Sequence, residues 1–456
     1  MGIDSRDLVI DKASRFKQRI DELRSNEYYS GEPQKLIDLF NKVVTQISES
    51  IKRADHENGI LMKRVNLLLS FYHLCLDEIE HIGASNIPVE MLPLFEQILK
   101  QLKLKTTLVF RPSPLYNYSY YPITKVIDRI NKSQGYSGLE IGEDIAVISF
   151  PSSEKSNALL HCSFAHELGH HFNEFFSIAD EIEPKVLELI DKELVKEYAN
   201  KYLEALSRTR TRVGPTEVTL DKFILEEHVV SQKTEEFAKI IRSWLDEIIS
   251  DIIALRIFGA SFLFAIAEFS ISHQDFKEYS EEHPPIFIRL KNLINCFDEL
   301  GFTNKLQEYE QVTKRLEFYR GISKNTFESQ DKTMSNIENM ILERGITNLF
   351  GPAKEIIDSR LKPLQTTCDF ADIKHAILAF RNLIPGNEVL NKDETSRPID
   401  AVSILNAAWI VRINFMDELY NMLAKTDKSE VRNILNELTL KSLDLQAFHS
   451  KMVETY

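Results

Sequence analysis

Cysteine is scarce in this chain of 456 residues, and the few cysteines are scattered with no paired spacing. They are Cys75, Cys162, Cys296 and Cys368. Scattered thiols of this kind are typical of reduced proteins in the cytoplasm, where disulfides do not persist. We therefore predict a cytoplasmic protein whose cysteines pack as small apolar side chains rather than forming a disulfide framework.

Long hydrophobic runs are also missing. The most apolar stretch, residues 257–267, is too short to cross a bilayer, and it directly follows Arg256. Residues 1–6 are polar and charged, so no secretory signal is expected there. These two observations predict that the chain does not insert into a membrane.

Positive charge is in deficit. The chain has 55 lysines and arginines against 69 aspartates and glutamates, which gives a formal net charge of −14. A broad nucleic-acid or anionic membrane surface needs a concentrated basic patch, and this balance argues against one. We expect no nucleic-acid partner.

What is present is mostly helical periodicity, with strand character between residues 105 and 150. The length allows two or three structural units. We predict a mainly α fold with a helical region at 1–105, a core with a small β-sheet at 106–300, and a second helical region at 301–456. The clearest local expectations are a helix at 52–80, strands at 105–111 and 145–150, a solvated basic loop at 207–215, and breaks at Gly351-Pro352 and 385–398. Tyr116, Tyr118 and Tyr120 alternate and would face one way if that segment is extended.

The most informative motif is the pentapeptide HELGH at residues 166–170. His166 and His170 are four positions apart, so on a helix they lie on one face and can bind one metal ion. Glu167 lies one step round the helix, where it can reach a water molecule bound to that metal. Zinc suits imidazole ligands and makes its bound water acidic enough to form hydroxide near neutral pH. Gly169 costs a helix roughly 1 kcal/mol relative to alanine, and close packing of another backbone would compensate.

A catalytic zinc site needs a third protein ligand. Residue 176, six positions after His170, is a phenylalanine, which excludes the group of enzymes that has a histidine there. The best candidate is Glu247, in an apolar helical stretch at 243–259; Asp246 and Glu174 are its rivals. Asp251, one turn later, could accept a hydrogen bond from the far nitrogen of a ligand histidine. His161 and His171 lie off the metal face and are expected to pack.

With these residues the chain resembles the gluzincin metallopeptidases, whose pattern is HExxH followed by ExxxD on a later helix. The stretch His283-Pro284-Pro285 followed by Arg289 resembles the HPP-x-x-x-R segment of the CAAX-prenyl endopeptidase family. That resemblance implies an α+β zincin-like core, with His283 and Arg289 near the metal to steady the oxyanion of the tetrahedral intermediate. Arg289 could instead be a structural ion-pair partner, and the two prolines could simply mark a turn before a helix. The resemblance covers residues 145–293, about a third of the chain. It departs from that family because those relatives are membrane-embedded.

These observations predict a zinc-dependent peptidase that acts on a protein or peptide substrate. Zn²⁺ would be held by His166, His170 and Glu247, with Glu167 as general base. The alternative is a regulatory or scaffold protein whose helical flanks bind a protein partner and whose zinc site is vestigial or gated. A DNA-responsive sensor carrying a peptidase domain ranks last, because the chain has no basic helix-turn-helix signal.

Overall fold

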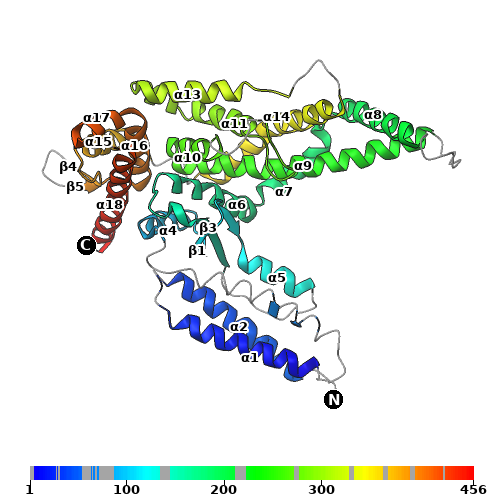
Figure 1. The fold of residues 1–456 in the computed structure, drawn as a ribbon, viewed down its shortest axis with the longest axis horizontal. Helices are drawn as coiled ribbons and strands as arrows, with labels where there is room; N and C mark the ends of the chain where they lie inside the picture. Colours follow the sequence, from blue (N-terminus) through cyan, green and yellow to red (C-terminus); the bar gives the residue numbers. More distant parts are fainter. Residues whose placement is uncertain are drawn as a thin grey trace. The chain divides into compact units, whose positions relative to one another are not determined.

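The chain is mainly helical with a small sheet formed by residues 106–151, as predicted (Figure 1). The computed structural model describes residues 5–26, 28, 31–53, 63, 65–66, 69–70, 87–133, 144–210, 222–271, 277–327, 333–362, 368–390, 396–424 and 427–455. It contains two compact units, Met1–Glu167 with Thr439–Tyr456, and Leu168–Leu438. Within the described residues, no helix combines the length and the apolar character that a membrane span requires.

The first unit combines helices with the main sheet. Its elements are α1 (Ser5–Arg24), α2 (Glu32–Arg53), η2 (Val89–Met91), α4 (Leu92–Gln101), β1 (Thr106–Ser113), β2 (Ser119–Tyr121), α5 (Ile123–Ser133), β3 (Asp144–Pro151), η3 (Ser152–Glu154) and η4 (Leu160–Ser163). Helices α1 and α2 pack against each other, and α5 packs against β3. Most of the helix predicted at 52–80 lies outside the described residues.

The sheet has the strand order β1-β3-β2. Strand β3 pairs in parallel with β1, Val109 opposite Val147, and antiparallel with β2, Tyr120 opposite Ile148. After Asp144 every residue of β3 is buried, because a central strand is covered on both faces and its β-branched apolar sequence suits that position. Both strands predicted from the sequence are therefore confirmed.

The three alternating tyrosines do not form one face. Only residues 119–121 are extended as β2, so Tyr116 lies before the strand and is 44% exposed, whereas Tyr118 is buried. Tyr120 is intermediate in exposure. The proline-bracketed segment before β2 turns rather than continuing the strand, which breaks the alternation on which the prediction depended.

The start of α6 (Phe164–Phe176) is fixed to the sheet by an aromatic cluster. The Phe164 ring packs edge-on against three other aromatic rings. The distances between ring centroids are 5.0 Å to Phe110 of β1, 5.6 Å to Phe150 of β3 and 5.8 Å to Phe95 of α4. Burying an aromatic side chain in this way stabilises the fold by several kcal/mol, on the order of 3–5 by truncation to alanine. The strand-to-helix connection therefore sets where the HELGH motif begins.

The second unit is almost entirely helical. After α6 it contains α7 (Ile178–Leu189), α8 (Lys192–Arg210), α9 (Lys222–Phe258), α10 (Ala260–Ile271), α11 (Ile286–Glu299), α12 (Phe302–Leu306), α13 (Glu310–Ser323), α14 (Met334–Arg360), α15 (Phe370–Arg381), β4 (Glu388–Leu390), β5 (Ser396–Pro398), α16 (Ala401–Asn414) and α17 (Met416–Leu423). The last helix, α18 (Lys428–Thr455), begins in this unit and belongs to the first unit from Thr439 onward. Helix α9 is 37 residues long and packs against α7, α8, α11 and α14 (Figure 1). It ends at Gly259, whose φ of +63° is the left-handed conformation that suits a glycine after a helix.

Two local predictions in this unit were wrong, and a third was confirmed. Residues 207–210 continue α8 instead of starting a loop, because they contain no glycine or proline; residues 211–215 lie outside the described part. Helix α14 runs through Gly351 and Pro352, and its packing against α7, α8 and α9 compensates for the hydrogen bond that proline removes. The predicted break at 385–398 is confirmed, because α15 ends before this segment and α16 begins after it; the segment also contains the antiparallel pair β4 and β5, which was not predicted.

Candidate metal centre

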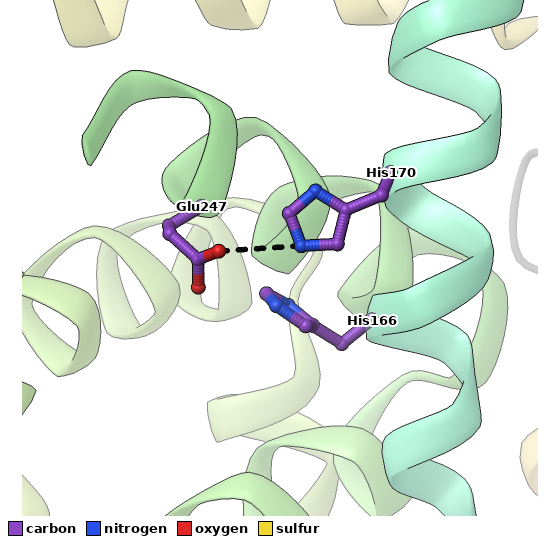
Figure 2. Close-up of side chains that lie close together, drawn as sticks. All are labelled: His166, His170 and Glu247. Carbon is purple, nitrogen blue, oxygen red and sulfur yellow. Dashed lines mark ion pairs between the residues drawn. The ribbon is translucent and has the colours of Figure 1, made fainter. Parts of the chain in front are cut away.

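Helix α6 presents His166 and His170 on the same face, as their spacing predicts (Figure 2). His166 is 6% exposed, and the side chain of His170 is 25% exposed. Figure 2 shows both imidazoles pointing toward the carboxylate of Glu247, which comes from α9. The two helices thus bring together residues that are about eighty positions apart in the sequence.

Gly169 is the residue that allows this approach. A Cβ atom built at Gly169 would lie 2.6 Å from the backbone oxygen of Ser250 and 2.7 Å from its Cα. The backbone of α9 therefore occupies the space that any side chain at position 169 would need. This contact explains the helical glycine, and it places Glu247, three residues before Ser250, opposite the two histidines.

The three side chains are arranged as a metal-binding group. One ligand atom from each of His166, His170 and Glu247 lies within 4.8 Å of the other two, and Nε2 of His170 is 3.3 Å from Oε1 of Glu247. Two ligands that are each about 2.0–2.1 Å from a tetrahedral zinc ion lie roughly 3.3 Å apart. Two imidazoles and one carboxylate also form a common donor set of catalytic zinc. The residues present therefore fit a zinc ion.

The second oxygen of Glu247 is held from the other side. Oε2 lies 3.4 Å from Nδ1 of His283 and 3.5 Å from Nη1 of Arg289. Arg289 also donates two hydrogen bonds to Asp251, Nε to Oδ2 at 2.8 Å and Nη2 to Oδ1 at 2.7 Å. Because Asp251 is fully buried, this paired geometry gives its carboxylate a charged partner. The sequence predicted a bond from a ligand histidine to Asp251, and that bond stays a prediction.

A short segment before α11 positions His283. Trp244 of α9 is fully buried, and its indole nitrogen donates a hydrogen bond to the backbone oxygen of Ser280 at 2.9 Å. The hydroxyl of Ser280 accepts a hydrogen bond from the backbone nitrogen of His283, also at 2.9 Å. Pro285 then precedes the first residue of α11. The His283 side chain remains 61% exposed, so it faces both Glu247 and solvent.

Glu167, the predicted general base, follows His166 on α6 and is 6% exposed. His171 is fully buried, and its ring lies 5.8 Å from that of Phe172. Cys162 is also fully buried. The burial of His171 and Cys162 fits the predicted packing roles.

His161 is a structural histidine at the entrance to α6. Its ring stacks on that of Phe164, with the ring centroids 4.8 Å apart. Its Nε2 donates a hydrogen bond of 3.2 Å to the backbone oxygen of Lys155, and its Nδ1 accepts one of 3.3 Å from the Tyr118 hydroxyl. Complete burial lowers the pKa of His161 to about 4, and the bond to Lys155 opposes that shift. The ring is therefore neutral near pH 7 and fixes the local chain.

Asn173 was not predicted from the sequence. It is buried on α6, one turn after His170, and its amide nitrogen donates to Oδ1 of Asp246 at 2.8 Å. Its amide oxygen accepts a hydrogen bond from the backbone nitrogen of Ala179 in α7. Burial raises the pKa of Asp246, and the Asn173 bond and the nearby His170 counteract that rise. A single buried asparagine has no distinctive spacing, so no sequence signal identifies it.

The two rivals of Glu247 do not join the three-residue group among the described residues. Glu174 is exposed, and Asp246 is engaged by Asn173.

Comparison of the chain with protein-family models, with curated proteins and with solved structures gave no match. The interpretation of this site therefore depends on its own residues and their geometry.

Proposed function

We propose that this protein is a zinc-dependent peptidase. The observation that carries the proposal is the convergence of His166, His170 and Glu247 from two helices into one group of ligand atoms. Among the common metals, zinc is the ion that a donor set of two imidazoles and one carboxylate fits best.

When bound, zinc supplies an acidic water molecule and polarises the carbonyl group of the bond to be cleaved. Glu167 would serve as the general base, which takes a proton from the attacking water and passes it to the leaving amine. Its burial on α6 supports this role, because a buried base is screened from bulk water. Glu247 presents one oxygen toward the histidines while its other oxygen is engaged by His283 and Arg289.

His283 and Arg289 have different parts in the proposal. The His283 side chain lies beside Glu247 and is 61% exposed, so we assign to it the hydrogen bond that steadies the oxyanion. Arg289 is 12% exposed and grips Asp251 with two hydrogen bonds, so its part is to hold the Glu247 carboxylate in place. The structural ion-pair role considered from the sequence is thus the one that the contacts of Arg289 support.

The surrounding fold agrees with the proposal. A central strand leads through a short connection into the metal-binding helix, and a small sheet packs at the start of that helix. These features support the α+β zincin-like core and the gluzincin relationship that the motifs imply. The proposed substrate is a protein or peptide, and the proposed location is the cytoplasm.

The test measures zinc content and peptide cleavage together. Wild-type protein should contain one zinc per chain and cut members of an unbiased peptide library, and a chelator should stop cleavage. Glu167→Gln should keep the zinc but lose at least about a hundredfold in rate, whereas His166→Ala should lose both.

A wild-type protein that binds no stoichiometric zinc would overturn the proposal. Stoichiometric zinc without turnover of any library peptide would instead favour the scaffold alternative with a vestigial or gated site.

A further inference from the structure

Asn173 joins three helices beside the metal-binding group. Its side chain is 6% exposed and lies on α6, three residues after His170. One end of its amide bonds α9 through Asp246, and the other end bonds the first turn of α7 through the backbone nitrogen of Ala179. Since the backbone nitrogen of Ala179 can only donate, the amide orientation follows: oxygen toward α7 and nitrogen toward α9.

The bonded acid is the immediate neighbour of Glu247. Asp246 and Glu247 are consecutive on α9, so a bond that holds Asp246 also restricts the rotation and sliding of α9 where Glu247 is presented. Another contact between the helices, Gly169 against Ser250, lies just over one turn further along α9 and prevents closer approach without resisting separation. A hydrogen bond between the two helices, such as that from Asn173 to Asp246, is the kind of contact that does resist separation.

We propose that Asn173 is a positioning residue, whose amide bond to Asp246 holds α6 and α9 at the spacing where His170 and Glu247 can share one metal ion. The inference rests on the proposed zinc site, but not on peptidase activity. It assigns to Asp246 the role of an anchor on α9, in place of the rival ligand role that the sequence left open.

The test exchanges the two partners and measures zinc affinity in competition with a chelator, together with the visible spectrum of the Co²⁺-substituted protein. Asn173→Asp keeps the acceptor for Ala179 but places a carboxylate against Asp246. It should weaken zinc binding about tenfold or more and change the Co²⁺ spectrum.

The double variant Asn173→Asp with Asp246→Asn restores a donor opposite an acceptor and should recover both the zinc affinity and the Co²⁺ spectrum of wild type. Asp246→Asn alone is the matched control, because its amide oxygen still accepts from Asn173; its affinity should stay within about threefold of wild type.

The outcomes separate the two proposals. If wild type binds no zinc, the zinc site itself is wrong. If wild type binds zinc and Asn173→Asp binds it equally well, or if the double variant shows no recovery, the positioning role is wrong and the zinc site stands. If Asp246→Asn alone weakens binding as much as Asn173→Asp, the charge of Asp246 matters rather than the bond, and the positioning role is again wrong.

Discussion

Gly169 shows how one residue without a side chain determines which helices can meet. A glycine in a helix interior is unfavourable by about 1 kcal/mol relative to alanine. Here the backbone of Ser250 fills the position of the missing Cβ, and the resulting approach brings Glu247 to His166 and His170. Local propensity and long-range packing therefore conflict at this residue, and packing prevails.

We expect Gly169→Ala to destabilise the protein. The added methyl would lie 2.6 Å from a backbone oxygen, so α6 and α9 must separate. Such overpacking costs about 1–3 kcal/mol, which exceeds the gain of about 1 kcal/mol in helix propensity. Urea unfolding in the presence of a chelator measures the change without the contribution of zinc.

Gly321→Ala in α13 is the control, because a Cβ atom there would meet no heavy atom within 4 Å. It should leave stability unchanged or raise it by up to about 1 kcal/mol. Unfolding of Gly169→Ala at or above the wild-type urea midpoint would contradict the close-contact argument.

Residues that combine a chemical type with a fixed spacing were the ones that the sequence could identify. The i, i+4 histidines and Glu247, an acid on an apolar helical stretch, both depend on local pattern, and the structure brings them together. The hydrogen bonds of Asn173 with Asp246 and of Trp244 with Ser280 join residues that are distant in sequence. A single sequence has no pattern from which such pairs can be predicted. The partner of Arg289 was left open for the same reason.

At the scale of elements, whether a segment is a helix or a strand was easier to predict than the residues at which it begins and ends. The strands β1 and β3 were found because β-branched apolar runs have no competing helical period. Helix ends were misjudged at positions 207 and 351, where polar residues or Gly-Pro suggested a break that tertiary packing overrides. The pair β4 and β5 was missed because each strand has three residues, too few to show a period.

The contact between α9 and α11 yields an element-scale prediction. Asp251 of α9 is fully buried and is bonded twice by Arg289 in the first turn of α11. Arg289→Met removes the partner of a buried charge and should reduce the free energy of unfolding by about 3–5 kcal/mol. Adding Asp251→Leu removes that charge as well and should recover most of the loss, as measured by urea unfolding with chelator present.

The exposed ion pair between Lys314 and Glu310 provides the control for the Arg289 and Asp251 variants. Lys314→Met in α13 removes the partner of Glu310, whose side chain is 74% exposed, and should change stability by less than about 1 kcal/mol. A loss for Arg289→Met as small as that for Lys314→Met would show that the Asp251 pair does not fasten α11 to α9.

At the scale of the whole molecule, the ligands are separated along the chain by α7 and α8, so the metal group exists only in the folded protein. A ligand that binds only the folded state stabilises it by about 2.7 kcal/mol at a free concentration one hundred times its Kd. Zinc should therefore raise the midpoint of thermal unfolding by a few degrees, and a chelator should reverse the rise. Glu167→Gln should keep the rise because it leaves all three ligands in place, whereas His166→Ala should lose it.

His228→Ala is the matched control, since His228 is an exposed histidine on the same helix as Glu247, and it should respond to zinc as wild type does. A thermal shift that survives in His166→Ala would mean that zinc stabilises the protein from some other position, and the two-helix site would not be its binding place.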